Sequence, residues 1–345
     1  TVYVYNRTPA VAQYAMLAGV ADGLLDENTI PQCDLILIAL FPQDTIDYLR
    51  KYGPVFNKNG VVMDCGGTKM EITKVGFEVA EKYGFTLSMW SDMFFRPWND
   101  GKYFIPKCWV PEEIMDSLPD SVIPVYWDYY HTDESAYGDM IENHRQLSNK
   151  TWFAGGVWSW RGVIPYNRFS IQSMIPALDA CKKHKIRNVF MTMWGDDGGE
   201  TPIFAVLPAL MHAAALAEGW SEDTMKEKFL EITGVSYDDM LTLDLPNYIY
   251  GPEHGVGTAN YSKNRLYNDP FLGIVDKNTE QPVDSAIFGE YAKILHENAE
   301  KYPEFGYLFE TQATLCDILT EKFELGVRTR ALYEKSDKEA IRALA

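Results

Sequence analysis

Cysteine is scarce in the 345-residue sequence, and no two cysteines have the CxxC spacing of a zinc site or a redox dithiol. The five cysteines are Cys33, Cys65, Cys108, Cys181 and Cys316. The six histidines also lack HxxxH and HxH spacings. We therefore expect free thiols in a reducing compartment, no disulfide framework and no metal site.

Long apolar runs are missing too, and no stretch reads as a membrane span. No secretory signal is visible, so we expect a cytoplasmic protein. Basic residues are fewer than acidic residues, with 31 Lys and Arg against 49 Asp and Glu, and the formal net charge is −18. Such a chain repels nucleic acid and anionic membranes and suits a neutral ligand such as a sugar, although its charge also simply favours solubility.

The front of the chain alternates strand and helix patterns. Apolar runs at residues 2–5, 33–40 and 60–64 predict strands, and residues 9–17, 45–52 and 69–83 predict helices. The run at 33–40 is of the kind found in strands that are buried on both faces. This order predicts an α/β segment with a parallel sheet.

After Phe85, four strand-like segments each end in a polar cluster that contains a tryptophan. The tryptophans are Trp90, Trp127, Trp158 and Trp194, spaced 37, 31 and 36 residues apart. A strand, helix and loop together need about 30 residues or more. Aromatic and acidic residues at the ends of successive strands are typical of the active face of a βα-barrel, and the alternative is that each tryptophan only plugs the rim.

The remaining sequence is predicted to be mostly helical. Residues 204–219, 221–233, 286–301 and 307–342 have helical patterns, whereas the Tyr- and Pro-rich stretch 248–276 predicts a loop.

The front segment resembles the nucleotide domain of prephenate dehydrogenases. The resemblance lies in Val4-Tyr5-Asn6-Arg7-Thr8, in residues 34–42 (DLILIALFP) and in residues 64–69 (DCGGTK). It implies that Asn6, Arg7 and Thr8 meet the 2′-phosphate of NADP, while the alternative is that Arg7 is a solvated charge. No GxGxxG turn precedes Val2, so the pyrophosphate site and the central strand are not found, and we expect little or no dehydrogenase activity.

From about Leu87 the sequence resembles glycoside hydrolase family 20, the exo-β-N-acetylhexosaminidases, and their bacterial branch in particular. The resemblance is carried by residues 90–95 (WSDMFF), 126–130 (YWDYY), 154–158 (AGGVW), 194–198 (WGDDG) and 268–273 (NDPFLG). It implies a barrel whose aromatic walls bind a terminal GlcNAc or GalNAc residue without a cofactor.

The resemblance assigns roles residue by residue. Trp90, Trp158 and Trp194 would wall the pocket, and Tyr126 would hold the acetamido oxygen. Asp128 and Asp196 would bind sugar hydroxyls, with Asp196 where many relatives have Glu. Asp92 and Tyr129 complete the substrate-binding set, and Asp197 and Tyr130 are adjacent candidates. The alternative to sugar binding for these carboxylates is that they cap the barrel rim or form a salt bridge, and for the tyrosines it is ordinary packing.

Family members use substrate-assisted catalysis, in which one carboxylate orients the acetamido group and an adjacent Glu protonates the leaving oxygen. That pair belongs on the fourth barrel strand, which we do not find. The acidic pairs at 112–113, 133–134, 222–223 and 238–239 lie in helix or loop contexts. No catalytic residue is therefore identified, and losing a general acid costs roughly 10²–10⁴-fold in rate.

Together these patterns predict an α/β fold in three parts. A partial Rossmann-like segment (1–86) is joined to the second half of a (β/α)8 barrel (87–218), followed by a mostly helical C-terminal region (219–345). The chain reads as a junction of two genes with both outer ends missing. We expect an impaired hexosaminidase, with a non-catalytic carbohydrate-binding chain or an NADP-linked dehydrogenase remnant as alternatives. Its oligomeric state is left open.

Overall fold

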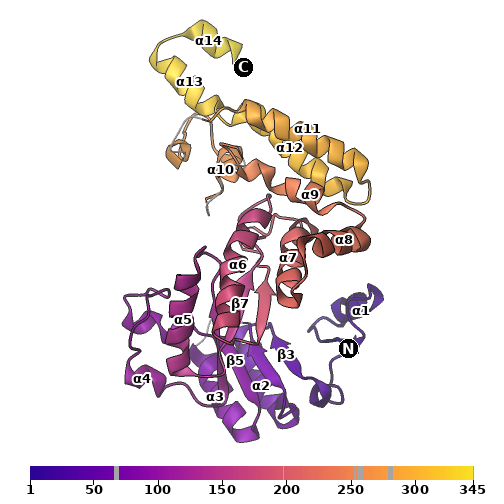
Figure 1. The fold of residues 1–345 in the computed structure, drawn as a ribbon, viewed down its shortest axis with the longest axis vertical. Helices are drawn as coiled ribbons and strands as arrows, with labels where there is room; N and C mark the ends of the chain where they lie inside the picture. Colours follow the sequence, from indigo (N-terminus) through magenta and orange to yellow (C-terminus); the bar gives the residue numbers. More distant parts are fainter. Residues whose placement is uncertain (66–69, 197, 252–253, 255–258, 279–282, 345) are drawn as a thin grey trace. The chain divides into compact units, whose positions relative to one another are not determined.

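The computed structural model describes residues 1–65, 70–196, 198–251, 254, 259–278 and 283–344 (Figure 1). The strands are β1 (Tyr3–Val4), β2 (Gly23–Leu24), β3 (Leu35–Ile38), β4 (Val61–Asp64), β5 (Thr86–Trp90), β6 (Val122–Trp127), β7 (Trp152–Gly156) and β8 (Val189–Thr192). The helices of the first half are α1 (Pro9–Leu17), α2 (Pro42–Tyr52), α3 (Met70–Tyr83), α4 (Glu112–Met115), α5 (Glu134–Leu147) and α6 (Asn167–Lys183). Those of the second half are α7 (Leu207–Glu218), α8 (Glu222–Thr233), α9 (Tyr237–Met240), α10 (Tyr261–Tyr267), α11 (Ala286–Lys301), α12 (Gly306–Lys322), α13 (Leu325–Glu334) and α14 (Lys338–Ala343).

The strands form two sheets. β1 and β2 make a two-stranded parallel sheet, and the other six form one sheet in the order β3-β4-β5-β6-β7-β8. Parallel pairing runs from β3 through β6, with Ile38 opposite Asp64 and Trp90 opposite Val125. The fold is α/β with a six-stranded parallel half-barrel sheet and a helical C-terminal region. The α/β class, the partial barrel and the helical region are as the sequence predicted, but β3 and β4, predicted to belong to a separate front segment, are part of the same sheet. The Rossmann-like character of the front segment stays a prediction.

The chain divides into two compact units that interleave along the sequence. The first unit comprises Thr1–Trp127, Gly138–Phe153 and His184–Val189. The second unit comprises Asp128–Tyr137, Ala154–Lys183 and Phe190–Ala345. The three-part division at residues 86 and 218 stays a prediction.

Helices α2 and α3 pack together in the first unit. Pro42 begins α2, where its missing N–H costs nothing, and Arg50 and Lys51 lie in the last turn, where the helix dipole favours cations. Gly53 follows α2 at a close approach, because a Cβ there would lie 2.6 Å from a methyl of Val79. The buried side chain of Leu49 adds to this core.

The helical part of the second unit is organised around the pair α11 and α12, which lie side by side in Figure 1 and share a core through Phe288, Leu295, Phe309 and Leu319. Helices α8, α9 and α10, which precede the pair, have side-chain N-caps. For example, Ser221 caps α8 by accepting a hydrogen bond from the N–H of Thr224 at 3.2 Å.

Two expectations for this region are wrong. Residues 261–267, predicted as loop, form α10, because the Asn260 side chain accepts from the N–H of Lys263 and caps a short helix. The single helix predicted over 307–342 is three helices, since the chain turns at Glu324 and again at Ser336, whose φ is +57°. No helix of the described residues is long and apolar enough to cross a membrane.

Candidate functional site

In the first unit, predicted site residues lie where β5 and β6 end. Trp90 ends β5 and is half-buried. Asp92 follows it and accepts hydrogen bonds from Arg96 at 3.0 Å and from the indole N–H of Trp127 at 3.4 Å. The Trp127 ring lies 4.7 Å from that of Tyr103. Asp92 is thus held between the Arg96 cation and the Trp127 indole, which packs on the Tyr103 ring.

Tyr126 lies on the face of β6 that α5 covers. Its buried ring is 4.8 Å from the ring of His144 and 5.2 Å from that of Phe153. Successive side chains of a strand point to opposite faces, and Trp127 rather than Tyr126 contacts Asp92, whereas the Tyr103 ring lies 4.7 Å from Trp127 and 6.4 Å from Tyr126. The contact of Tyr126 with an acetamido oxygen stays a prediction.

His144 is at the centre of a buried polar network that includes Ser91 and Tyr103. Burial lowers the pKa of His144 to about 4, so the ring is neutral. Its Nδ1 donates to the carbonyl of Met140 at 2.7 Å, and its Nε2 lies 2.7 Å from the hydroxyl of Ser91, which also donates to the carbonyl of Val125 at 2.8 Å. Ser91 in turn lies 2.8 Å from the Tyr103 hydroxyl. The network ties the end of β5 to α5.

In the second unit, Asp128 is enclosed at the end of β6. Its carboxylate accepts from the N–H groups of Tyr130 at 3.0 Å and His131 at 3.4 Å, and from Nδ1 of His131 at 2.7 Å. This hydrogen bond raises the pKa of His131 against the opposing effect of burial. Asp128 therefore fixes the turn that presents the exposed Tyr130 ring. Its predicted contact with a sugar hydroxyl is untested.

The aromatic cluster of the second unit brings three predicted residues together, Tyr129, Trp158 and Trp194. The Tyr129 hydroxyl hydrogen-bonds to Thr192 and Trp194, and burial raises its pKa to about 12. The indole N–H of the buried Trp158 donates to the carbonyl of Tyr129 at 2.9 Å. These contacts link the segments that follow β6 and β7 to the end of β8.

Two further residues complete the aromatic cluster and were not predicted as site residues. Trp160 stacks on Trp158 with ring centroids 4.6 Å apart and meets Tyr129 edge-on at 5.5 Å. Gly156 makes room for both rings, because a Cβ there would lie 2.6 Å from Tyr129 and 2.8 Å from Trp160. Trp160 lies beyond the end of β7, so no strand alternation marks it, and its place in the cluster depends on the approach of Tyr129.

Accessibility differs within the predicted set. Asp128, Tyr129 and Trp158 are buried, whereas Trp194 is half-buried and Asp196 is exposed. Asp197 lies outside the described residues, as do residues 66–69 of the front motif.

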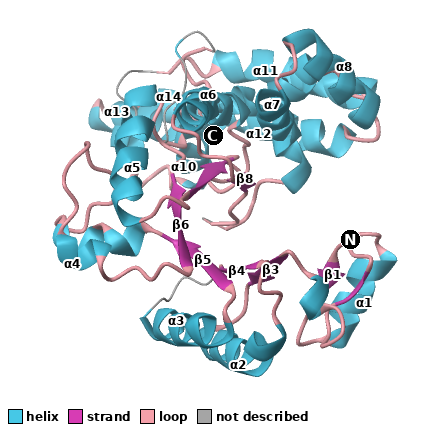
Figure 2. Cartoon of the chain, turned by 60° about the horizontal axis from the view of Figure 1, so that its bottom comes forward, coloured by secondary structure: helices cyan, strands magenta, loops and turns pink. Residues whose placement is uncertain are grey.

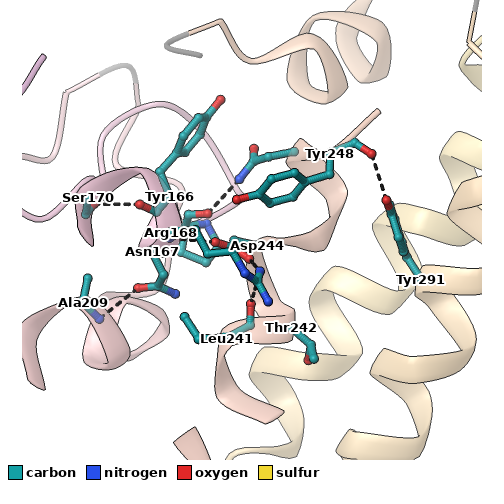
Figure 3. A network of polar contacts seen from close by, with 12 residues as sticks. Tyr166, Asn167, Arg168, Ser170, Ala209, Leu241, Thr242, Asp244, Tyr248 and Tyr291 are labelled. Carbon is teal, nitrogen blue, oxygen red and sulfur yellow. Dashed lines mark hydrogen bonds and ion pairs between the residues drawn. The ribbon is translucent and has the colours of Figure 1, made fainter. Parts of the chain in front are cut away.

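A polar network anchors the C-terminal helices of the second unit to α6 (Figure 3). Asp244 lies in the 3-10 helix Leu241–Asn247, is 1% exposed, and forms an ion pair with Arg168 of α6. The N–H of Arg168 also donates to Asp244 at 2.9 Å, and its guanidinium donates to the carbonyl of Leu241 at 2.9 Å. Burial raises the pKa of Asp244 to about 6 despite this cation.

The same helix leads back to the aromatic cluster. The Ser170 hydroxyl donates to the carbonyl of Tyr166 at 2.7 Å and accepts from the N–H of Trp158 at 2.9 Å. The orientation of Trp158 therefore depends on α6, which the Arg168–Asp244 pair holds.

The acidic pairs that the sequence offers are helix-start residues. Residues 112–113, 222–223 and 238–239 lie in the first turns of α4, α8 and α9, and Asp133 precedes α5 and accepts from the N–H of Ala136 at 3.0 Å. Negative charge there stabilises the helix dipole. Among the described strands of the six-stranded sheet, β4 ends in a carboxylate, that of the buried Asp64. No group of three or more metal-binding side chains gathers in the part of the chain that the structure describes.

The residues predicted to meet NADP line a small crevice of about 350 Å³ together with residues 39–41 and Asp44. Arg7 lies 3.7 Å from the carboxylate of Asp44, and Asn6 accepts from the N–H of Thr8 at 2.8 Å. The anion beside Arg7 offsets its attraction for a phosphate. Binding of NADP by Asn6, Arg7 and Thr8 stays a prediction.

Comparison with known proteins supports the glycoside hydrolase resemblance. Residues 238–345 match the family model of the glycoside hydrolase 20C C-terminal domain. One solved structure with some similarity is that of a GH138 enzyme targeting pectin rhamnogalacturonan II, with 8% sequence identity and a TM-score of 0.32. The alignment covers 100% of this chain and 58% of that chain. No curated protein matches the chain. The C-terminal match supports a glycoside-hydrolase-like function, and the resemblance to prephenate dehydrogenases stays a prediction.

Proposed function

We propose that this chain binds a terminal N-acetylhexosamine residue and hydrolyses β-N-acetylhexosaminides poorly. The observation that carries the proposal is the aromatic cluster of the second unit, where Tyr129 forms hydrogen bonds with both Trp158 and Trp194. The match of residues 238–345 to a glycoside hydrolase 20C domain supports the class of ligand. A neutral sugar also suits a chain of net charge −18.

Within the cluster we assign two kinds of role. Trp194 is partly accessible and Asp196 is exposed, so these side chains would stack on the sugar ring and accept from its hydroxyls. The enclosed Asp128, Tyr129 and Trp158 would hold the loops in place. The accessible Tyr130 ring, 5.3 Å from that of Trp158, would form the side of the site.

The test measures binding and turnover on the same sample. Calorimetry with GlcNAc-thiazoline is expected to show binding, and a chromogenic β-GlcNAc glycoside is expected to show hydrolysis that is slow or absent. Trp194→Ala should weaken binding about tenfold or more, because a stacked aromatic face is lost. The matched control is Trp109→Ala, which removes a tryptophan that is 77% exposed and belongs to the first unit.

Each outcome is decisive. Equal effects of the two substitutions, or no binding at all, would overturn the proposed site. Rapid hydrolysis would overturn the proposed impairment, and Asp64→Asn would then test whether the carboxylate that ends β4 supplies the acid.

A further inference from the structure

Two loops of the second unit carry the tryptophans of the aromatic cluster. Residues 157–162 follow β7 and include Trp158, and residues 193–200 follow β8 and include Trp194. Gly198 of the second loop has a φ of +106°, in a region that favours glycine. Glycine loses more conformational freedom on folding than any other residue, so this loop depends on contacts with other segments to keep one shape.

Glu200, at the end of the second loop, contacts α10, a helix of seven residues at Tyr261–Tyr267 (Figure 2). Its carboxylate forms an ion pair with the ammonium of Lys263 at 2.6 Å and accepts from the hydroxyl of Tyr267 at 2.9 Å. The hydrogen bond with Lys263 lowers the pKa of Glu200 against the opposing effect of partial burial, so the carboxylate is charged at neutral pH. The same side chain packs on its own loop, because a Cβ at Gly198 would lie 3.3 Å from its Cδ.

The aliphatic stem of Lys263 packs against the first loop. Gly162 ends that loop with a φ of +140°, and a Cβ there would lie 2.6 Å from Cδ of Lys263. Asn260, the N-cap of α10, donates to the carbonyl of Arg161 at 2.8 Å. The two loops also meet directly, since the hydroxyl of Thr201, which follows the second loop, donates to the carbonyl of Gly162. The start of α10 therefore contacts both loops, and Lys263 contacts each with a different part of its side chain.

We propose that Lys263 is a positioning residue of the sugar site, which holds the loops that carry Trp158 and Trp194 in the arrangement that binds the ligand. This inference rests on the proposed function, and it makes α10 a part of the site. α10 lies in the region 238–345 that matches the glycoside hydrolase 20C C-terminal domain, so that domain contributes to sugar binding through the two loops. The Lys263 side chain is 21% exposed and that of Glu200 is 26% exposed, so water screens their attraction only in part.

The variant Lys263→Met keeps the stem that packs on Gly162 and removes the charge that meets Glu200. We expect calorimetry with GlcNAc-thiazoline to give a dissociation constant about tenfold higher than that of the unaltered chain, because small displacements of binding groups are costly. Lys263→Arg keeps the cation and should bind within about threefold of the unaltered chain. Amide hydrogen exchange in Lys263→Met should be faster at residues 194–196 and 198–200, and Lys263→Ala, which also removes the stem, should extend this effect to residues 159–162.

The matched control is Lys301→Met on α11, which removes the ion pair of Lys301 with Asp239 at 2.8 Å in the same unit. It should leave the ligand affinity and the exchange of both loops unchanged. Equal effects of Lys263→Met and Lys301→Met on affinity would overturn the inference and leave the proposed function intact. If the unaltered chain binds no ligand, the proposed function fails, and the exchange data alone decide whether Lys263 holds the loops. Faster exchange confined to the loops then supports that role, and unchanged exchange overturns it.

Discussion

Replacing Arg168 by Met tests whether the ion pair with Asp244 anchors the C-terminal helices to α6. The substitution leaves a carboxylate that is 1% exposed without its cation. Removing one partner of a buried pair costs about 3–5 kcal/mol, and the 35% exposure of the Arg168 side chain places the expected loss near the lower end, about 3 kcal/mol, at neutral pH. For a domain of this size that lowers the melting temperature by roughly 6–12 °C.

The pH dependence distinguishes this mechanism from lost packing. The pKa of Asp244 in the folded chain is about 6, above the value of about 3.9 in an unfolded chain. The folded state therefore binds this proton more tightly, and the contribution to stability increases as pH falls through 6. Without Arg168 the pKa rises further, so the deficit of Arg168→Met should shrink between about pH 7 and about pH 5.

The assay is urea or thermal unfolding followed by circular dichroism at both pH values. Arg187→Met controls for loss of an exposed arginine. The double variant Arg168→Met with Asp244→Leu should recover much of the loss, because it buries no charge. A loss under about 1 kcal/mol at neutral pH, or one that is unchanged at the lower pH, would refute the reasoning.

Three other outcomes are expected. Gly156→Ala puts a Cβ 2.6 Å from the Tyr129 ring, so it should lower the stability by about 1–3 kcal/mol and abolish the binding of GlcNAc-thiazoline measured by calorimetry. An unchanged affinity would contradict the role of this glycine. His296 lies 3.0 Å from each of two carboxylates of α12, and these raise its pKa. Its protonation therefore stabilises the fold at a pH below the pKa of the unfolded chain, and this gain is lost as the pH rises through the pKa of the folded chain. In thermal melts, His296→Gln should destabilise by under about 1 kcal/mol at roughly pH 6 and have no effect at roughly pH 9. Cys181 is buried, and burial raises its pKa to about 12. A thiol reagent should therefore label the exposed Cys108 in the native chain and Cys181 only in urea. Labelling of both cysteines in the native chain would show that the core opens.

The sequence predicted the strands of the half-barrel because apolar runs and tryptophans recur at the length of a βα unit. Those runs coincide with β5 to β8, and the parallel sheet is confirmed. Both segments were predicted to be parallel α/β, so the front segment was a candidate to cover an open strand edge of the half barrel. Which strands pair could not be predicted, because the runs at 60–64 and 87–90 resemble different families and resemblance says nothing about hydrogen bonding between strands.

The direction of each side chain on its strand could not be predicted from the motifs. Tyr126 was chosen by motif, but alternation along β6 turns its ring toward His144 and leaves Trp127 beside Asp92. Trp160 and Gly156 were missed because their importance depends on the approach of Tyr129, which is distant in sequence. The breaks at Glu324 and Ser336 were missed because no proline or glycine stands at either position.

The continuous pairing of β3, β4 and β5 has a consequence for how this chain can be divided. A fragment that begins at Thr86 would follow the change in family resemblance, yet it would remove β4 from beside β5, so the buried Leu87 would lose Val62, which lies opposite it, and the buried Phe85 would be absent. Bare, apolar strand edges recruit other chains. The place where the resemblance changes is therefore a poor place to cut, and a well-behaved fragment of the first unit has to include the strands on both sides of it.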